Sequence, residues 1–302
     1  MREFEFIDDL MRRSVAHPNV EVGIGDDAAV LKLDSKRLVV TTDTMVEHVH
    51  FFSETPAACI GHKLVQMNVS DLVAMGAKPK FATLNLSLPS MSSDWLEAFM
   101  SALNSALSVA DCVLVGGNTT SSAQMHLGLT VFGEPLFSKP LLRSTASVGD
   151  VIAVSGSLGG AAAVLNQLYE LPIELRALDN PDYTAWHRPT ARLDLLASLA
   201  EATSMIDISD GLLQDLAHLC QQSRVGAELI SASIPVTDNA TLNDALHGGE
   251  DYQLLGTWRD LSVVPTGFRV IGRCVSEERI LLDQQVIEPK GWDHFHGAES
   301  NN

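Results

Sequence analysis

Residues 57–76 read AACIGHKLVQMNVSDLVAMG, a stretch that predicts one long helix with a polar group near its end. Its apolar residues recur at helical spacing, and Gly76 is placed to end the helix as a C-cap. Asn68, Ser70 and Asp71 interrupt the apolar pattern. A lone carboxylate among apolar neighbours is costly unless it is paired or bound to a metal. The pattern therefore favours a functional role for Asp71.

Strands and helices alternate along the rest of the chain. β-branched or alternating residues predict strands at about 38–42, 81–88, 112–115, 126–133, 151–154, 227–230, 252–256 and 269–272. Amphipathic spacing predicts helices at about 3–17, 94–110, 161–169, 189–203 and 211–223, with Asp94 as the cap of the second of these. Strands that alternate with helices indicate α/β or α+β domains.

The chain is expected to form two domains. Its 302 residues are enough for two ordinary domains, and hydrophobic periodicity is lost between Arg143 and Asp150. We therefore expect an N-terminal domain at residues 1–143 and a C-terminal α/β domain at residues 150–302.

Composition and charge narrow the class of function. The 46% of hydrophobic residues and 19% of charged residues are typical of a globular protein. The formal charge of −18 argues against nucleic acid and against an anionic membrane surface as partners. An acidic protein that handles anionic substrates needs metal ions or local basic groups, because like charges repel.

The cysteines and the absence of long apolar runs favour the cytoplasm. Cys59, Cys112, Cys220 and Cys274 lie far apart in apolar runs, which favours buried free thiols over disulfides or a zinc site. The acidic start of the chain is not typical of a signal peptide. No stretch approaches the roughly eighteen apolar residues of a membrane span.

Acidic residues recur beside glycine or at the ends of predicted strands. They lie in Gly25-Asp26-Asp27, Thr41-Thr42-Asp43, Ser70-Asp71, Asp207-Ile208-Ser209-Asp210-Gly211 and Gly248-Gly249-Glu250-Asp251. Carboxylate and hydroxyl oxygens suit hard cations such as Mg²⁺. So many acids around one pocket would repel each other and any phosphate unless metal ions lay between them. The pattern predicts a metal-dependent enzyme that handles phosphates.

Each of these motifs has a plainer alternative. One motif formally fits a dinucleotide-binding loop, namely Gly23-Ile24-Gly25-Asp26-Asp27-Ala28. Its two aspartates would repel the pyrophosphate, so a metal-bearing turn or a solvated surface turn is favoured. Thr41-Thr42-Asp43 is expected to end a strand, with one hydroxyl on the side of Asp43. Asp207 and Asp210 are expected on one turn at the start of a helix, where Ser209 or Asp210 could also serve only as the N-cap.

Two further motifs remain open. The turn at 156–160 could bind phosphate through backbone N–H groups, but such a turn is more often structural. His48 and His50 resemble a zinc pair, yet no further ligand lies at finger spacing, so His50 is better interpreted as a substrate contact. No P-loop and no protein-kinase motif is present in the sequence.

Eight motifs together carry a resemblance to a known family over about residues 4–295. In chain order they are Gly25-Asp26-Asp27-Ala28-Ala29, Thr42-Asp43-Thr44, His50-Phe51, Asn68-Val69-Ser70-Asp71-Leu72, Gly116-Gly117-Asn118-Thr119-Thr120, Asp207-Ile208-Ser209-Asp210-Gly211-Leu212, Gly249-Glu250-Asp251-Tyr252 and Gly291-Trp292-Asp293-His294-Phe295. The first alone indicates only the aminoimidazole ribonucleotide synthetase-like superfamily. The last three narrow the resemblance to the thiamine-monophosphate kinase family.

The resemblance implies an activity and an assembly. The activity is Mg²⁺-dependent transfer of the γ-phosphoryl group of ATP to thiamine monophosphate, with several Mg²⁺ ions bound. The assembly is a homodimer in which two N-terminal domains form a shared β-barrel, while the C-terminal domain completes each pocket. No general base is expected, because the accepting phosphate is already largely deprotonated near neutral pH.

The resemblance also implies roles for individual residues. The metal ligands would be Asp27, Thr41, Thr42, Asp43, Asp71, Asn118, Asp207 and Asp210. The ATP contacts would be Gly117, Asn118, Arg143 and Ser209. The thiamine phosphate contacts would be His50, Glu250 and Trp292, where the tryptophan can stack on the cationic thiazolium ring or serve only as a packing anchor.

One motif departs from the family pattern. The family usually has Gly-Gly-Asp-Thr-Thr-Arg, whereas this chain has Asn118 in place of the aspartate and Ser121 in place of the arginine. Two alternatives stay open. An ATP-dependent cyclo-ligase of the same superfamily would share the aspartate cluster, and Asn118 favours a homologue that binds nucleotide and metal with weakened catalysis.

Overall fold

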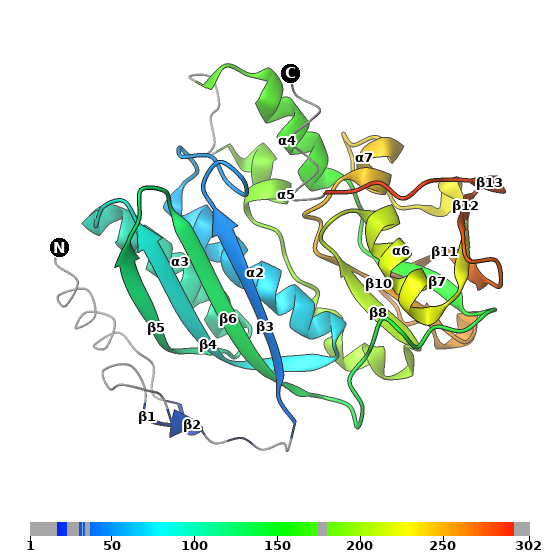
Figure 1. Ribbon diagram of the computed structural model, residues 1–302, viewed down its shortest axis with the longest axis horizontal. Helices are drawn as coiled ribbons and strands as arrows, with labels where there is room; N and C mark the ends of the chain where they lie inside the picture. The colour runs from blue at the N-terminus through cyan, green and yellow to red at the C-terminus, as the bar shows by residue number, and fades with distance from the viewer. Residues whose placement is uncertain (1–16, 23–29, 32, 34–36, 174–179, 293–302) are drawn as a thin grey trace. The chain divides into compact units, whose positions relative to one another are not determined.

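The computed structural model describes residues 17–22, 30–31, 33, 37–173 and 180–292, and these form a mixed α/β protein, as predicted (Figure 1). The chain divides into two compact units, one made of Met1–Leu72 and Ala77–Ser138 and the other of Val73–Gly76 and Lys139–Asn302. The helix predicted at 3–17 falls almost wholly outside the described residues. In the part of the chain that the structure describes, no helix has both the length and the hydropathy needed to cross a membrane.

The first unit is built on a four-stranded sheet in the order β3-β6-β4-β5. Its elements are β3 (Val39–Val46), α2 (Ala57–Ala74), β4 (Ala77–Leu88), α3 (Ser93–Val109), β5 (Val113–Ser121) and β6 (His126–Pro135), preceded by the short pair β1 (Val20–Val22) and β2 (Val30–Leu31). Only β4 and β5 pair in parallel, because α3 carries the chain back between them. Helices α2 and α3 cover one face of the sheet (Figure 1).

Glycines allow the two helices to lie close together and to end where the sequence predicts. A Cβ at Gly61 would overlap the Phe99 carbonyl oxygen, so α2 approaches α3 closely at this position. Gly76 has a φ of 68° after the end of α2, which confirms the predicted C-cap. The cap predicted for α3 is wrong. Ser92 accepts the N–H of Trp95, and Asp94 lies in the first turn.

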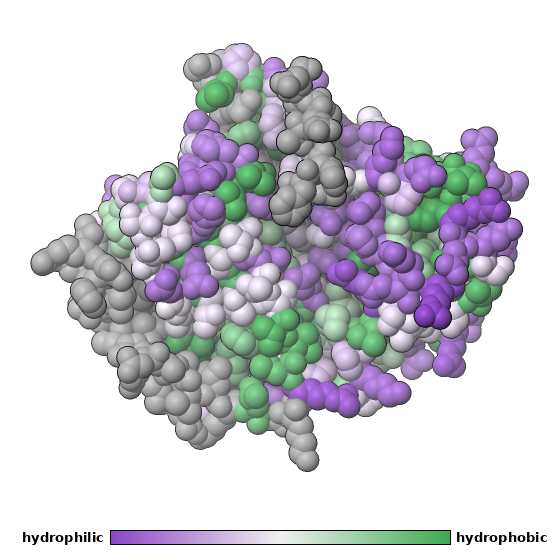
Figure 2. All heavy atoms as spheres, in the orientation of Figure 1, coloured by the Kyte–Doolittle hydropathy of each residue, from purple (hydrophilic) through white to green (hydrophobic). Residues whose placement is uncertain are grey.

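The side chains of the four-stranded sheet alternate between a covered face and an open face. Thr42, Thr130, Thr83 and Gly116 form one cross-strand row, and Thr44, Gly128, Asn85 and Asn118 form the next. These two rows define what we call the open face, which carries small uncharged side chains. Figure 2 shows it as mostly pale, with a hydrophobic patch near the start of β3.

The second unit contains a seven-stranded sheet in the order β13-β12-β9-β11-β7-β10-β8. Its strands are β7 (Val151–Ser155), β8 (Ser204–Ile208), β9 (Gly226–Leu229), β10 (Gln253–Trp258), β11 (Phe268–Val275), β12 (Ile280–Leu282) and β13 (Gln285–Val286). Its α-helices are α4 (Gly160–Glu170), α5 (Thr184–His187), α6 (Leu212–Ser223) and α7 (Leu242–His247). Its 3₁₀ helices are η2 (Pro181–Tyr183), η3 (Leu193–Glu201), η4 (Ser231–Ser233) and η5 (Leu261–Val263). The apolar face of α6 packs on alternate residues of β7, β8 and β10, such as Val154, Ile206 and Leu255, to form the core.

Several predicted elements need correction. The strand expected to end at Asp43 continues to Val46, because Asp43 pairs with Leu129 in the middle of the ladder. The segment predicted as a helix at 189–203 contains η3, a 3₁₀ helix, at Leu193–Glu201. Strand β8 was not predicted, although Asp207 lies within it. The four cysteines are free thiols, as predicted, and three of them are buried.

Candidate functional site

Two of the predicted metal-binding segments meet where β3 crosses α2. Thr41 and Asp43 lie on the covered face of β3, and the Thr41 hydroxyl donates a hydrogen bond of 2.5 Å to Asp71 Oδ2. The Asp43 N–H donates to Asn68 Oδ1 at 3.2 Å, and Asn68 is fully buried. Asn68 and Asp71 are three apart on α2, so their side chains share one side of the helix. We call Thr41, Asp43, Asn68 and Asp71 the β3–α2 cluster.

The electrostatics of the β3–α2 cluster favour a bound cation. Burial, together with the nearby charge of Asp71, raises the pKa of Asp43 from 3.8 to about 7. Two close carboxylates, a hydroxyl and an amide oxygen are the ligand types that Mg²⁺ takes. Among the described residues, no group of three or more His, Cys, Asp or Glu side chains lies close enough to hold a metal ion. Asp27, the remaining acid predicted here, lies outside the described residues.

Other residues predicted as metal or ATP contacts lie on the open face instead. Thr42 accepts a hydrogen bond of 3.0 Å from the Thr130 hydroxyl on that face. Asn118 pairs with Asn85 in the next row, and β6 and β4 separate its strand from β3. Gly117 falls in the row of Asp43, and a Cβ there would overlap the Leu84 carbonyl. The side chains of Thr42 and Asn118 therefore do not join the β3–α2 cluster of the same chain.

His50 lies just after β3, and one of its ring nitrogens is used by the backbone. Its Nδ1 accepts the N–H of Val46 at 3.0 Å, which leaves the ring proton on Nε2. His48 lies 3.4 Å from the Ser53 hydroxyl through its own Nε2. The two histidines thus stabilise the turn after β3, and His50 presents a defined tautomer.

The second group of predicted residues lies in the second unit, in the loop between β8 and α6. Asp207 is buried in β8 opposite Leu254 and is not on the first turn of α6, so the predicted shared helical turn with Asp210 is wrong. Neither Ser209 nor Asp210 caps α6 with its side chain, because the N-cap position is Gly211. Gly211 has a φ of 120°, a value that glycine adopts readily.

Asp215 holds the loop from within α6. Its Oδ2 accepts the backbone N–H groups of Ser209, Asp210 and Gly211 at 3.1, 3.1 and 3.2 Å. Burial and the nearby charge of Asp210 raise the pKa of Asp215 to about 7, although these three hydrogen bonds oppose the rise. The backbone that carries two predicted site residues is therefore fixed by one buried carboxyl group.

Glu250 reaches the same loop through its backbone. The Glu250 N–H donates to the Ser209 carbonyl at 2.8 Å, and the Tyr252 N–H donates to the Ile208 carbonyl at 2.8 Å. Glu250 and Tyr252 have φ values of 65° and 49°, in the left-handed region. Such values cost non-glycine residues about 1–3 kcal/mol each and persist only where neighbouring contacts fix them. We call residues 250–252 the Glu250 turn.

Asp251 explains the glycine-rich turn before α4. Its Oδ2 accepts the Gly159 N–H at 2.8 Å, and the N–H groups of Gly160 and Ala161 bond to it as well. Burial nevertheless raises the pKa of Asp251 to about 7. Because a carboxyl group of the chain itself occupies these backbone donors, the structure favours the structural interpretation of the turn over a phosphate site.

Trp292 also lies at the β8–α6 loop. Its N–H donates to the Asp210 carbonyl at 3.1 Å, while its residue remains 47% exposed. His247 Nδ1 lies 3.0 Å from the Lys290 carbonyl, so the segment is held at two points. Ser209, Asp210, the Glu250 turn and Trp292 therefore form one group, which we call the β8–α6 cluster.

Arg143 is not part of the β8–α6 cluster. Its carbonyl accepts hydrogen bonds from Ser204, at the start of β8, and from Ser223, at the end of α6. Ser209 lies beyond the other end of both elements. The 12 residues of α6 alone span about 18 Å. The backbone of Arg143 therefore lies at the opposite end of the second unit from Ser209.

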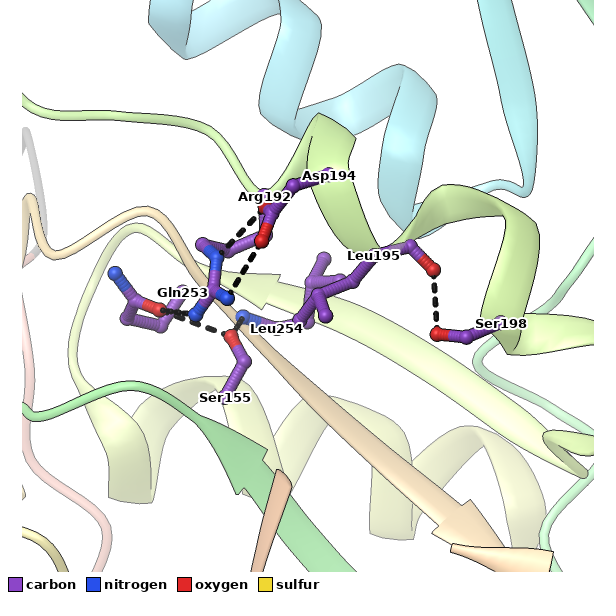
Figure 3. A network of polar contacts seen from close by, with 7 residues as sticks. All are labelled: Ser155, Arg192, Asp194, Leu195, Ser198, Gln253 and Leu254. Atoms are coloured by element: carbon purple, nitrogen blue, oxygen red, sulfur yellow. Dashed lines mark hydrogen bonds and ion pairs between the residues drawn. The ribbon is translucent and has the colours of Figure 1, made fainter. Parts of the chain in front are cut away.

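A further polar network supports the strand that follows the Glu250 turn. Arg192 bonds to Asp194 and to the Gln253 side chain, and Ser155 bonds to Gln253 (Figure 3). Neither Arg192 nor Asp215 was identified from the sequence. One feature of the sequence could have identified Asp215, because it is an acid on the apolar side of its helix.

Comparison with known families defines the class of the protein. The family model for the AIR synthase related protein N-terminal domain matches residues 25–134, and the model for the C-terminal domain matches residues 147–257. The chain is thus a two-domain AIR synthase related protein.

Curated relatives narrow this class. The thiamine-monophosphate kinase of Aquifex aeolicus is 35% identical over 285 residues, which cover 90% of this chain and 92% of the relative. That of Escherichia coli K12 is 35% identical over 303 residues, covering 92% and 93%. The chain belongs to the thiamine-monophosphate kinase family.

Solved structures agree with this assignment. The crystal structure of the thiamine-monophosphate kinase from Stenotrophomonas maltophilia K279a has a TM-score of 0.83 at 35% identity, covering 95% of this chain and 98% of that chain. The structure described as AaThiL complexed with AMPPCP and TMP has a TM-score of 0.79 at 33% identity, covering 98% and 99%. The hydrogenase maturation protein HypE, at 20% identity, shares the fold.

Proposed function

We propose that the chain transfers the γ-phosphoryl group of ATP to the phosphate of thiamine monophosphate, giving thiamine diphosphate and ADP. The observation that carries this proposal is the 35% identity to thiamine-monophosphate kinases over 90% of the chain. A similar structure is described as a complex with AMPPCP, an ATP analogue, and TMP, so both proposed substrates have a precedent at this fold. The protein is then a transferase of thiamine biosynthesis.

The proposal includes several Mg²⁺ ions. In the first unit Thr41, Asp43 and Asp71 would hold Mg²⁺, because the Thr41 hydroxyl bonds to Asp71 and the charge of Asp71 acts on the buried Asp43 carboxyl group. In the second unit Asp207 and Asp210 would be the ligands. When bound, Mg²⁺ neutralises the phosphate oxygens and allows two anions to approach. Asp27, Thr42 and Asn118 stay proposed ligands, and the side chains of the last two would serve a site separate from the β3–α2 cluster.

The protein side chains bind and orient the substrates. His50, Glu250 and Trp292 are proposed to contact thiamine monophosphate, with the exposed indole of Trp292 against a cationic ring. Gly117, Asn118 and Ser209 are proposed to contact ATP. Arg143 stays a proposed ATP contact, but at a different part of the nucleotide from Ser209, because its backbone lies at the opposite end of the second unit. No general base is assigned, because the accepting phosphate oxygen is largely deprotonated near pH 7. Catalysis then depends on position and charge neutralisation.

The open face of the first unit supports the proposed homodimer with a shared barrel. None of the eight positions in its two cross-strand rows carries a charged side chain. Depletion of charge is characteristic of the core of protein interfaces. Residues 1–143 would pair with their copy, and residues 150–302 would complete each pocket. Sedimentation velocity measures the assembly, and a monomer at micromolar concentration would refute it.

The proposal also includes a cytoplasmic location. All four cysteines are free thiols, and free thiols are typical of a reducing compartment.

One experiment tests the activity. Purified protein is incubated with ATP, Mg²⁺ and thiamine monophosphate, and thiamine diphosphate and ADP are separated by chromatography. Equal amounts of the two products support the proposal. ADP without thiamine diphosphate, or neither product at saturating substrates, would overturn it.

A further inference from the structure

The Glu250 turn is fixed at each of its residues by a different contact. Glu250 and Tyr252 bond through their N–H groups to the end of β8, and Asp251 accepts the Gly159 N–H. The next residue, Gln253, begins β10 and is fixed through its side chain. Two residues of this turn have left-handed backbone angles, so the turn depends on these contacts to keep its shape.

Arg192 provides the charged end of the contact to Gln253. Its Nη1 donates to Gln253 Oε1 at 3.1 Å, and the Ser155 hydroxyl donates to the same oxygen at 2.9 Å (Figure 3). The Ser155 oxygen in turn accepts the Leu254 N–H at 2.8 Å. These bonds join the ends of β7 and β10 directly beside the Glu250 turn.

Asp194 fixes the guanidinium of Arg192 in the orientation that this contact needs. Arg192 Nε and Nη2 donate to the two oxygens of Asp194 at 3.0 and 2.9 Å. The Arg192 side chain is 19% exposed, so the pair is shielded from water on the arginine side. A two-point pair of this kind sets a direction as well as a charge. The remaining guanidinium nitrogen of Arg192, Nη1, is thereby directed at Gln253.

We propose that Arg192 is a positioning residue, which acts through Gln253 to keep the Glu250 turn in its left-handed conformation and so presents Glu250 to the substrate. The presentation to substrate rests on the proposed function, whereas the effect on the turn does not. Arg192 itself need not touch a ligand. Among the described residues, its loss leaves the Gln253 side chain with the Ser155 hydroxyl as its one hydrogen-bond partner, which loosens the side chain that anchors the start of β10.

The first test measures the turn without any substrate. Hydrogen exchange is followed by mass spectrometry in the wild type, in Arg192→Gln and in Arg273→Gln. Arg273 is the matched control, because it forms a similar pair with Glu228 in the same unit but is 66% exposed. We expect exchange at Glu250 and Tyr252 to be about tenfold faster in Arg192→Gln only, because a hydrogen bond from a charged donor is lost.

A second variant distinguishes a local effect on the turn from general unfolding of Arg192→Gln. Gln253→Ala removes the same contact from the other side and leaves the Arg192–Asp194 pair intact. It should accelerate exchange at the same two amides, while peptides from β11 keep their wild-type rates. Unchanged exchange at Glu250 and Tyr252 in Gln253→Ala would overturn the proposal, as would equal acceleration throughout the unit.

The third test connects the turn to the substrate. In Arg192→Gln the KM for thiamine monophosphate should rise about tenfold, with the KM for ATP within about twofold. The double variant with Gln253→Ala should be no worse than the poorer single variant, because both act through one contact. Equal increases in both KM values, or additive effects, would overturn the positioning role. If the wild type makes no thiamine diphosphate, the proposed function fails, and the exchange test still decides the role of Arg192 in the turn.

Discussion

The substitution Asp43→Asn should stabilise the protein without metal while it removes activity. Asp43 is a buried acid beside Asp71, and its pKa is raised from 3.8 to about 7. Without a cation, the ionised Asp43 of the folded state therefore bears the cost of burial and of repulsion by Asp71, and the unfolded state bears neither. An asparagine has nearly the same shape and carries no charge, so it removes the cost of the buried charge together with the negative charge that would hold a metal ion.

The magnitude and the sign follow from the difference in pKa. As pH rises above 4, the unfolded chain releases the proton of Asp43 first, so stability falls until the folded state also releases it near pH 7. A rise of about three pKa units corresponds to about 4 kcal/mol above pH 7 and to about 2 kcal/mol at pH 5. Relative to the wild type, Asp43→Asn should therefore gain up to about 4 kcal/mol at pH 8 and about half of that at pH 5.

The assay is urea unfolding in EDTA at pH 5 and pH 8, with turnover measured separately at saturating Mg²⁺. Asp111→Asn is the matched control in the same unit. Asp111 forms an exposed ion pair of 2.7 Å with Lys78, which lowers the pKa of Asp111. Its loss should lower the free energy of unfolding by at most about 1 kcal/mol. Turnover should fall about a thousandfold in Asp43→Asn and stay near wild type in Asp111→Asn.

Two outcomes would refute this reasoning. A free energy of unfolding for Asp43→Asn that is below wild type in EDTA at pH 8 would mean that the charge of Asp43 does not destabilise the β3–α2 cluster. Wild-type turnover of the variant at saturating Mg²⁺ would mean that Asp43 is not a ligand in the active protein.

Three further predictions test other parts of the molecule. Trp292→Ala should raise the KM for thiamine monophosphate about five- to thirtyfold with little change in kcat, because ring stacking contributes roughly 1–2 kcal/mol. Steady-state kinetics measures this, and equal effects on the KM of both substrates would instead indicate a packing anchor. Asp215→Ala should lower the free energy of unfolding by about 2–4 kcal/mol, because three backbone N–H groups lose their acceptor. Urea unfolding measures this change, and a loss below about 1 kcal/mol would contradict the prediction. Thr44→Arg puts a charge on the open face and should convert a dimer to a monomer in sedimentation velocity. Ser101→Arg, on the exposed side of α3, should leave the dimer intact. A dimeric Thr44→Arg variant would exclude the open face as the interface.

The sequence predicted most strongly those elements whose hydrophobic pattern is long. The helix at 57–75 and the strand at 126–133 correspond to α2 and β6, because their side chains repeat over several turns or pairs. Strand β8 has only five residues, and all of them are buried, so it shows no alternation. The polar Asp207 inside it was assigned to the following helix for that reason.

The faces of the sheet could not be predicted from local spacing. The family resemblance groups Thr42 and Asn118 with Asp43 as metal ligands, without regard to which face of the sheet each side chain lies on. Whether they share a face depends on the strand order β3-β6-β4-β5 and on the irregularity between Ala82 and Thr83, and both arise from pairing between distant segments. Thr41 and Asp71, which the resemblance also groups, lie within hydrogen-bonding distance in the structure, and their role as metal ligands stays a prediction.

The aspartates of this chain differ in the groups that compensate their negative charge, and this difference separates structural from functional acids. Asp215 and Asp251 each accept several backbone N–H groups at the start of a helix, so the protein itself compensates them. Asp43 instead faces Asp71, and among the described residues no hydrogen bond to its carboxyl group is seen. Both kinds stand in similar motifs beside glycine or serine, so their sequences look alike. A buried carboxyl group that lies near another carboxyl group and accepts no such hydrogen bonds is left uncompensated, and this is the physical reason to propose the first metal at the β3–α2 cluster.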